Sequence, residues 1–458
     1  MSSFKWTSLF ACSTASFLIP FMSSSINVAL PMIGAEFKLD VFLLNWVVTS
    51  FLFSLAIFLI PFGRYADIRG RIRIFKTGLI IYLLSSLLSA LSNSTYLLIF
   101  SRLIQGIGGA MVSSTAVAIL TSIFPPNERG KALGINTSAV YIGLSTGPFI
   151  GGLLTYSFGW RSLFMVNIPV CLLALTLTHT VLKGGDSEAS GGDFDFAGSV
   201  LYSLMLIALI YGVSIHPNPA SAPILAAGLL FSIVFIFRSL RVRNPVLELG
   251  MFRNITFTFS NIAALINYSS TYALSYLLSL YLQYLKGFNP QQAGLILSIQ
   301  PIVMAIFSPL AGWLSDRVEP RIVASIGMSI ITICLALLSS INQQSQLSLV
   351  IAILFTLGLG FALFSSPNTN AVMSSADRRL YGVASAVLGT MRFIGQVLSM
   401  MIVMLISSIT IGRSEITPEK YPMLMLSIKT SLQIYVFLCF IGILASLARG
   451  RVRKLSYN

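Results

Sequence analysis

Charged residues are scarce in this sequence. Only 9% of its 458 residues are Asp, Glu, Lys or Arg, whereas 55% are hydrophobic. A soluble domain carries about 25% charged residues, so a chain of this composition cannot cover itself with polar surface in water. This excludes a water-soluble globular protein, and we expect a polytopic membrane protein embedded in a lipid bilayer.

Residues with catalytic or metal-binding chemistry are also few. The four cysteines lie in apolar segments, at Cys12, Cys171, Cys334 and Cys439. Their spacing resembles neither a metal site nor a disulfide framework. The two histidines, His179 and His216, have no partner motif. The sequence contains no nucleotide-binding loop or catalytic constellation, so we expect neither an enzyme nor an ATP-driven pump, and no bound cofactor or metal.

Long apolar runs make up most of the chain. Stretches of about 18 or more apolar residues mark membrane-spanning helices, and we count fourteen of them. Their approximate ranges are 8–33, 43–62, 74–92, 96–123, 131–157, 162–182, 197–214, 221–238, 257–285, 292–314, 322–341, 346–373, 381–411 and 425–447. The sequence therefore predicts an all-α membrane protein with fourteen transmembrane helices.

The net charge of +15 follows from the loops between these spans. In a soluble protein it would suggest a nucleic-acid partner, but cytoplasmic loops of membrane proteins carry an excess of Lys and Arg. With both termini in the cytoplasm, the large majority of the 29 Lys and Arg residues fall on that side. We therefore expect a plasma-membrane protein with cytoplasmic N- and C-termini and no nucleic-acid partner.

A short pattern occurs twice along the chain. Gly63-x-x-x-Asp67 follows the second predicted span, and Gly312-x-x-x-Asp316 follows the tenth. If spans seven and eight are an inserted pair, the tenth span is the second helix of a second set of six. The predicted plan is six plus two plus six helices with a parallel repeat, which is typical of transporters with two related halves.

Composition divides the predicted plan into parts. A Gly-, Ser- and Asp-rich segment without an apolar period follows the sixth span and indicates a linker. The expected parts are an N-terminal six-helix half (1–183), a cytoplasmic linker (184–196), an inserted helix pair with the following loop (197–253), and a C-terminal six-helix half with a basic cytoplasmic tail (254–458).

Several motifs resemble those of the major facilitator superfamily. They are the loop 63–73, Arg102-x-x-Gln105-Gly106-x-Gly108 in the fourth span, and Gly143-x-x-x-Gly147-Pro148-x-x-Gly151-Gly152 in the fifth. Further stretches resemble the fourteen-helix drug:proton antiporter branch, namely Asn27-Val28-Ala29-Leu30-Pro31, Trp160-Arg161 with Asn167-Ile168-Pro169, Asp195-x-x-Gly198, Met251-Phe252-Arg253-Asn254, Tyr281-Leu282-Gln283 and Arg392-x-x-Gly395. The resemblance implies the major facilitator fold, a small-molecule substrate, a proton gradient as driving force and a monomer.

Two of these motifs indicate how parts of the transporter would move. In the fifth span, glycines four residues apart share one helix face, which another helix can approach to backbone contact. Gly143, Gly147 and Gly151 form this face, within an antiporter-type motif that also includes Gly134, Pro148 and Gly152. We expect Gly143, Gly147, Pro148 and Gly151 to form a sliding contact between the halves. The resemblance implies a cytoplasmic gate at Gly63, Asp67, Arg69, Gly70 and Arg71, and the repeat adds Gly312, Asp316 and Arg317. The alternative is that these loop charges are simply solvated.

The first span departs from the family pattern. The family carries an Asp five residues before the Asn of the Asn27 motif, and this chain has Met22 there. Methionine neither takes up a proton nor attracts a cation. Either the substrate is neutral, zwitterionic or anionic, or coupling uses an acid at a membrane interface, such as Asp67 or Glu36.

Two arginines lie inside predicted spans, where charge is costly and usually functional. Arg102 and Arg392 either bind backbone carbonyls within one half or contact a substrate anion. The candidates for lining a substrate cavity are Met22, Asn27, Asn136, Asn267, Tyr268, Tyr272, Tyr276, Gln300, Asn368, Arg392 and Gln396. The amides among them serve equally well as contacts between helices.

Together these features predict a secondary transporter that exports hydrophobic or amphiphilic small molecules by alternating access, in exchange for protons. The alternative is a facilitator or exchanger for an anionic or neutral metabolite or lipid. The residue at Met22 favours the alternative, and the glycines of the fifth span favour the exporter.

Overall fold

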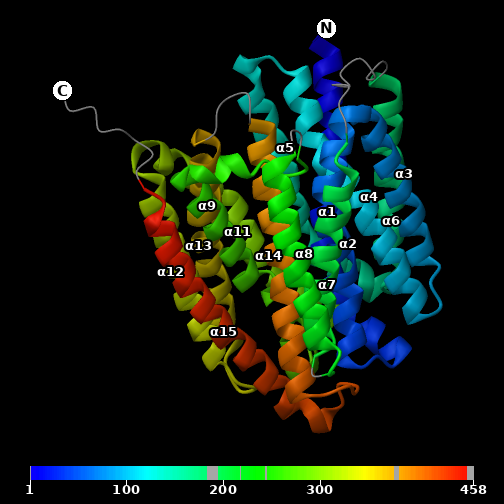
Figure 1. Ribbon diagram of the computed structural model, residues 1–458. Helices are drawn as coiled ribbons and strands as arrows, with labels where there is room; N and C mark the ends of the chain where they lie inside the picture. The colour runs from blue at the N-terminus through cyan, green and yellow to red at the C-terminus, as the bar shows by residue number, and fades with distance from the viewer. Residues whose placement is uncertain (1, 183–193, 217, 243–244, 376–380, 451–458) are drawn as a thin grey trace. The chain divides into compact units, whose positions relative to one another are not determined.

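The computed structural model of the chain describes residues 2–182, 194–216, 218–242, 245–375 and 381–450, and over these ranges the chain is helical with short connections (Figure 1). Thirteen of the helices are long and apolar enough to cross a membrane. Helices dominate because a bilayer offers no water to backbone N–H and C=O groups, which a helix satisfies within one segment.

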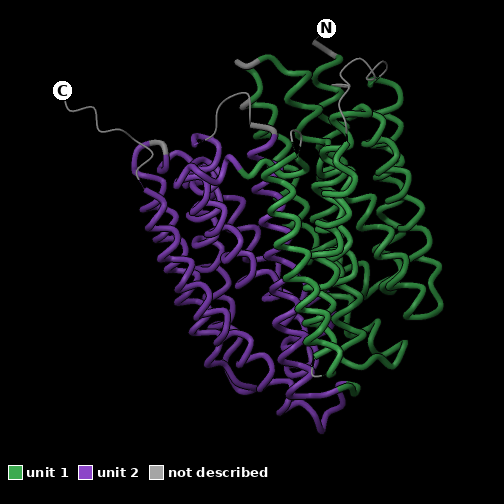
Figure 2. The backbone as a smooth tube through the Cα atoms, in the orientation of Figure 1, with its two compact units in different colours: residues 1–249, 413–415 green, residues 250–412, 416–458 purple. Residues whose placement is uncertain are grey.

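The chain forms two compact units (Figure 2). The first comprises residues 1–249 with 413–415, and the second comprises residues 250–412 with 416–458. Helices of the first unit are α1 (Ser2–Phe37), α2 (Val41–Arg69), α3 (Arg71–Ala90), α4 (Thr95–Ile123), α5 (Pro126–Phe158), α6 (Arg161–Val181), α7 (Phe196–Ser214) and α8 (Ser221–Arg241).

In the second unit, a short 3₁₀ helix at Leu249–Arg253 leads into the membrane helices. The elements that follow are α9 (Ile255–Thr271), α10 (Leu274–Leu280), a π-helical turn (Tyr281–Leu285), α11 (Pro290–Arg317), α12 (Pro320–Ser340), α13 (Leu347–Ser374), α14 (Tyr381–Thr410), a 3₁₀ turn (Pro418–Lys420) and α15 (Tyr421–Ala448).

The predicted span 257–285 is not one continuous helix. It is divided between α9 and α10 at Tyr272–Ala273 and ends in the π-helical turn. The backbone N–H of Ala273 donates to the Ser399 hydroxyl of α14 at 3.1 Å. A side chain of a neighbouring helix thus satisfies a donor at the break, which is how interrupted helices are tolerated in membranes.

Glycines set the closest helix contacts of the first unit. In α4, a β-carbon added at Gly108 would lie 2.8 Å from the carbonyl oxygen of Gly78 in α3 and 2.7 Å from the backbone nitrogen of Tyr82. Gly106, half a turn away, meets the backbone of Phe51 and Leu55 in α2. With no side chain at these positions, α4 packs backbone to backbone against α3 and α2.

The second unit repeats this arrangement. In α12, a β-carbon at Gly327 would lie 2.7 Å from the carbonyl oxygen of Gly360 in α13. Gly358 of α13 approaches the carbonyl oxygen of Gln300 in α11, at 2.5 Å from an added β-carbon. The Gly-x-Gly pair of α13 therefore corresponds to that of α4, which supports the internal repeat expected from the loop motifs.

The helix pair α7–α8 belongs to the first unit. The Tyr202 hydroxyl donates to the carbonyl oxygen of Ala56 in α2 at 3.2 Å. Asp195 caps α7 by accepting from the Gly198 N–H at 2.9 Å, and it also accepts from Arg238 of α8 at 2.8 Å. The pair thus packs on α2, whereas residues 183–193 of the expected linker lie outside the described residues.

We predict that Gly108→Ala destabilises the protein, because the new methyl group meets backbone atoms that cannot move aside. Overpacking of this kind costs roughly 1–3 kcal/mol. Gly109→Ala is the matched control, since a β-carbon there lies 3.4 Å or more from its neighbours on α2. Thermal unfolding in detergent should show a clear loss for the first variant and little change for the second. Equal melting temperatures would contradict the packing described here.

Candidate functional site

The loop after α2 is a sharp elbow held by an ion pair. Gly70, at φ 103°, is the one residue between α2 and α3. Just after this bend, Arg71 Nε donates to Asp67 Oδ1 at 2.8 Å, and Arg71 Nη1 reaches the Ala118 carbonyl of α4 at 3.5 Å. Asp67 therefore pairs with a nearby arginine, while Arg69 is exposed.

The corresponding end of α11 has different contacts. Gly312 faces Ser366 of α13, and the guanidinium carbon of Arg317 lies 4.1 Å from the centre of the Trp313 ring. In the first unit, Gly63 likewise faces Ser114 of α4. The expected role of the Asp316 carboxylate cannot be placed, because that side chain lies outside the described residues.

The glycine face of α5 packs against α1. A β-carbon at Gly143 would lie 2.6 Å from the Phe17 carbonyl oxygen, and one at Gly151 would lie 2.5 Å from Ser25 Cβ. Gly147 faces the Ser24 hydroxyl. The close partner of this face is therefore a helix of the same unit, which corrects the expectation that its partner belongs to the other half. Gly134 is exposed with no atom within 4 Å of an added β-carbon.

Met22 of α1 is fully buried, and its side chain contacts α6. The Asn167 side chain donates from Nδ2 to Met22 Sδ at 2.9 Å and to the Leu163 carbonyl at 3.1 Å. Within the described part of the chain, Asn167 Oδ1 has no hydrogen-bond partner. The sequence analysis did not predict Asn167 as a site residue, although it is a polar side chain inside an apolar span.

Arg102 is buried in the middle of the first unit. Its Nη1 donates to Gln105 Oε1 at 2.5 Å and its Nε to the Val47 carbonyl at 3.3 Å. The guanidinium also lies over the Phe51 ring, 4.5 Å from its centre. Gln105 in turn donates to Ser86 of α3 at 2.8 Å. These contacts join α2, α3 and α4, as expected for an arginine bound within its own half.

A second fully buried arginine is Arg449, which lies just after the end of α15, where the sequence predicts that the basic cytoplasmic tail begins. Its Nη1 donates to Asn368 Oδ1 of α13 at 3.0 Å, and its Nε to the Ser446 carbonyl at 2.9 Å. Burial lowers the pKa of Arg449 to about 10, so it stays charged at neutral pH. Nothing in its sequence context distinguished it from the exposed cations of a cytoplasmic end.

The remaining cavity candidates fall into two groups. Five amide and tyrosine side chains are at most 5% exposed: Asn27, Asn136, Asn267, Tyr276 and Asn368. Five others are half-buried: Tyr268, Tyr272, Gln300, Arg392 and Gln396. Of these ten, the structure brings together Tyr268 and Arg392, whose guanidinium carbon lies 5.7 Å from the centre of the tyrosine ring.

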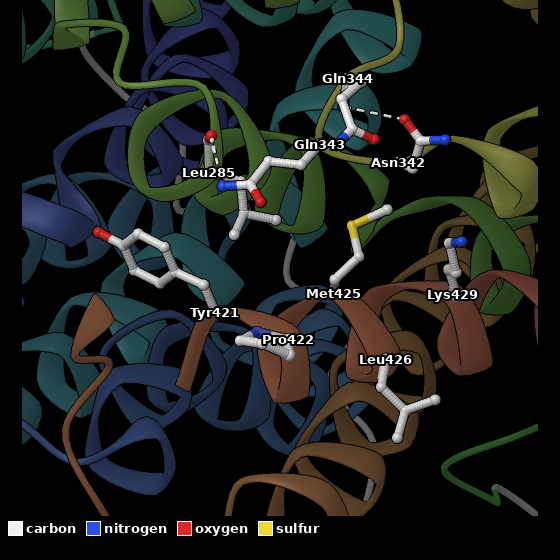
Figure 3. Close-up of a pocket in the computed structure, with 9 residues that line it drawn as sticks. All are labelled: Leu285, Asn342, Gln343, Gln344, Tyr421, Pro422, Met425, Leu426 and Lys429. Atoms are coloured by element: carbon white, nitrogen blue, oxygen red, sulfur yellow. Dashed lines mark hydrogen bonds between the residues drawn. The ribbon is translucent and has the colours of Figure 1, made fainter. Parts of the chain in front are cut away.

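One pocket of about 400 Å³ lies at the end of the second unit that is remote from Arg449 (Figure 3). Amide side chains of the α12–α13 loop, including Gln343 and Gln344, lie across from Tyr421, Met425 and Lys429 of α15. Its volume suits a small molecule, but none of the cavity candidates lines it, and sequence reasoning did not indicate it.

These features describe a multi-pass membrane protein of two helical units with repeated glycine contacts. Residues 12–400 match the Major Facilitator Superfamily, and the chain belongs to this family of transporters. Solved structures show the same fold. A bacterial homologue of the human lysosomal transporter Spinster matches with a TM-score of 0.66 at 19% identity, covering 98% of both chains. The peptide transporter POT in complex with sulfate matches with a TM-score of 0.69 at 15% identity, covering 98% of this chain and 96% of that one.

Curated relatives are similar over most of their length. The riboflavin transporter RibZ of Clostridioides difficile is 31% identical, covering 85% of each chain. The multidrug resistance protein Stp of Mycobacterium tuberculosis is 31% identical over 84% of this chain and 73% of its own. The cephamycin export protein CmcT of Amycolatopsis lactamdurans is 31% identical over 85% and 82%. Multidrug and antibiotic exporters are thus among the relatives of this chain.

We predict that Gln105→Leu destabilises the first unit, because it removes an acceptor from the buried Arg102 guanidinium. Hydrogen bonds to charged groups contribute about 1.5–3 kcal/mol each. Gln105→Glu keeps an oxygen acceptor for Arg102 and should retain most of the stability. Melting temperatures of the two variants in detergent test this. If Gln105→Leu is as stable as the parent, the network does not hold α4 in place.

Proposed function

We propose that this chain exports hydrophobic or amphiphilic small molecules across the plasma membrane by alternating access, in exchange for protons. In this proposal the protein acts as a monomer, with both termini in the cytoplasm and the basic loops on that side, in keeping with the positive-inside rule. The Asp67–Arg71 pair at the α2–α3 elbow would then hold a cytoplasmic gate.

The contact of α5 with α1 carries this proposal. The face of Gly143, Gly147 and Gly151 lies against the backbone of α1, and the sequence of this face resembles the antiporter signature of the family. Because α1 and α5 belong to the same unit, this close contact would keep the two helices together as one body while the units alternate. The multidrug resistance and cephamycin export proteins among the relatives support the outward direction.

A second candidate is a facilitator or exchanger for an anionic or neutral metabolite or lipid. The observation that favours it is the uncharged pair of Met22 and Asn167, at a position where the family carries a carboxylate. The similarity to a riboflavin transporter also fits a substrate other than a cationic drug. For the proton-driven exporter, by contrast, the coupling proton would have to bind an acid near a membrane surface, such as Glu36 or Asp67.

Transport is tested with purified protein in liposomes and dansylglycinamide, an uncharged amphiphilic fluorophore. Exchange with protons predicts that the probe accumulates in liposomes with an acidic lumen beyond the level in protein-free liposomes, and that an ionophore abolishes this excess. We expect Gly147→Val to lower the rate at least tenfold, because the side chain would meet Ser24 and the Phe21 carbonyl.

Gly134→Val is the matched control on the same helix, since an added β-carbon there meets no atom within 4 Å. Its transport rate should equal that of the parent. The proposal fails if the parent protein moves no probe under a pH gradient of either direction.

The Met22 position gives a separate prediction. Met22→Asp places a carboxylate where Asn167 Nδ2 already donates, and we expect the variant to gain several-fold faster transport of the cationic dye rhodamine 6G. Met22→Asn, which cannot ionise, should leave the rate unchanged. The efflux rates of the dye are measured for both variants at pH 6 and pH 8. Equal rates for the two variants would show that the residue at position 22 does not set the preferred substrate charge.

A further inference from the structure

Arg392 lies inside the membrane-length apolar span of α14, nine residues beyond Val383, where that span begins, and eighteen residues before Thr410, where it ends. An ionised arginine within such a span is costly unless something compensates its charge.

The structure supplies little compensation. Among the residues that it describes, none forms an ion pair or hydrogen bond with the Arg392 guanidinium. Two aromatic rings lie near the guanidinium carbon, with the ring centre of Tyr268 of α9 at 5.7 Å and that of the neighbouring Phe393 at 5.9 Å. A guanidinium within about 6 Å of a ring gains roughly 0.5–2 kcal/mol, which is less than the several kcal/mol that burying a charge costs.

The other two buried arginines show what a structural role requires. Arg102 and Arg449 are both fully buried, and each donates to a side-chain amide and to a backbone carbonyl. Arg392 differs in both respects. It is half-buried, and no side-chain amide or backbone carbonyl of a described residue accepts a hydrogen bond from it. Its donors therefore remain available to a ligand that enters the second unit.

Two polar groups near Arg392 also lack hydrogen-bond partners among the described residues. Gln396 lies one turn further along α14, so the two side chains share a helix face, and Gln396 is half-buried with no hydrogen bond to a described residue. On α9, the Tyr268 ring stands beside the guanidinium, and its hydroxyl also has no partner in the described chain. The α9 and α14 backbones are in contact here, because Gly395 packs on Leu265 and Tyr268.

We propose that Arg392, Gln396 and Tyr268 form a subsite for the anionic group of an aromatic amphiphilic substrate. The planar guanidinium donates two parallel hydrogen bonds to a carboxylate or a similar oxyanion. Gln396 donates a further bond, and the Tyr268 ring stacks on the aromatic part of the substrate. This assignment rests on the proposed transport function and narrows its substrate class to aromatic carboxylates and related anions.

The test compares dansylglycine, which carries a carboxylate, with its uncharged amide dansylglycinamide. Fluorescence titration of the purified protein in detergent gives both dissociation constants. We expect the parent to bind the carboxylate at least tenfold more tightly than the amide. Arg392→Gln should remove this preference by weakening carboxylate binding at least tenfold, while its affinity for the amide changes less than twofold and so reports a folded site.

Two variants complete the design. Arg392→Lys retains a charge but not the planar pair of donors, so it should keep part of the preference. Arg253→Gln removes one exposed cation of the same unit and controls for net charge, with no expected effect on either probe.

The inference is overturned if the parent does not favour the carboxylate, including the case in which it binds neither probe, or if Arg392→Gln keeps the full preference. Liposome transport of the uncharged amide separates this result from the proposed function. If the protein transports the amide but shows no preference for the carboxylate, the proposed subsite is wrong and the proposed export function stands. If it prefers the carboxylate but transports nothing, the subsite stands and the export function is wrong.

Discussion

Direct contact between helix backbones is the interaction on which this structure depends. Lipid tails are as apolar as the side chains they meet, so burial alone does not hold helices together in a bilayer, and close packing must do so. Gly78 with Gly108, and Gly327 with Gly360, bring two helices of each unit to within van der Waals contact of their peptide groups. The same device joins α5 to α1 and α14 to α9.

Much of the fold could be predicted because hydropathy and charge act over whole segments. The apolar runs located nearly every helix to within a few residues, and the doubled Gly-x-x-x-Asp motif indicated the repeat. The break at Tyr272–Ala273 escaped prediction, because it depends on a hydroxyl that reaches over from Ser399. No local pattern in an apolar run reports a partner 126 residues away.

The candidate site was less predictable than the fold. The sequence showed that Arg102 and Arg392 lie in spans, but whether each is internally bonded depends on which way its side chain points in the folded unit. Burial of Arg449 depends on Asn368, 81 residues earlier. Arg102 and Arg392 look alike in sequence. Only the acceptors around them in the folded unit distinguish an arginine that joins helices from one whose donors are not used.

The α7–α8 pair has a consequence for how such a chain could arise. Gly212 packs on Leu225 and Gly228 on Leu209, so each helix receives a leucine from the other. The carboxylate of Asp195 and the guanidinium of Arg238 close the hairpin at its open end. A hairpin with its own interlocking contacts can enter or leave a gene as a single module, without requiring compensating changes in the helices that precede and follow it in the chain. Insertion of such a hairpin then needs one recombination event rather than a gradual redesign of the bundle.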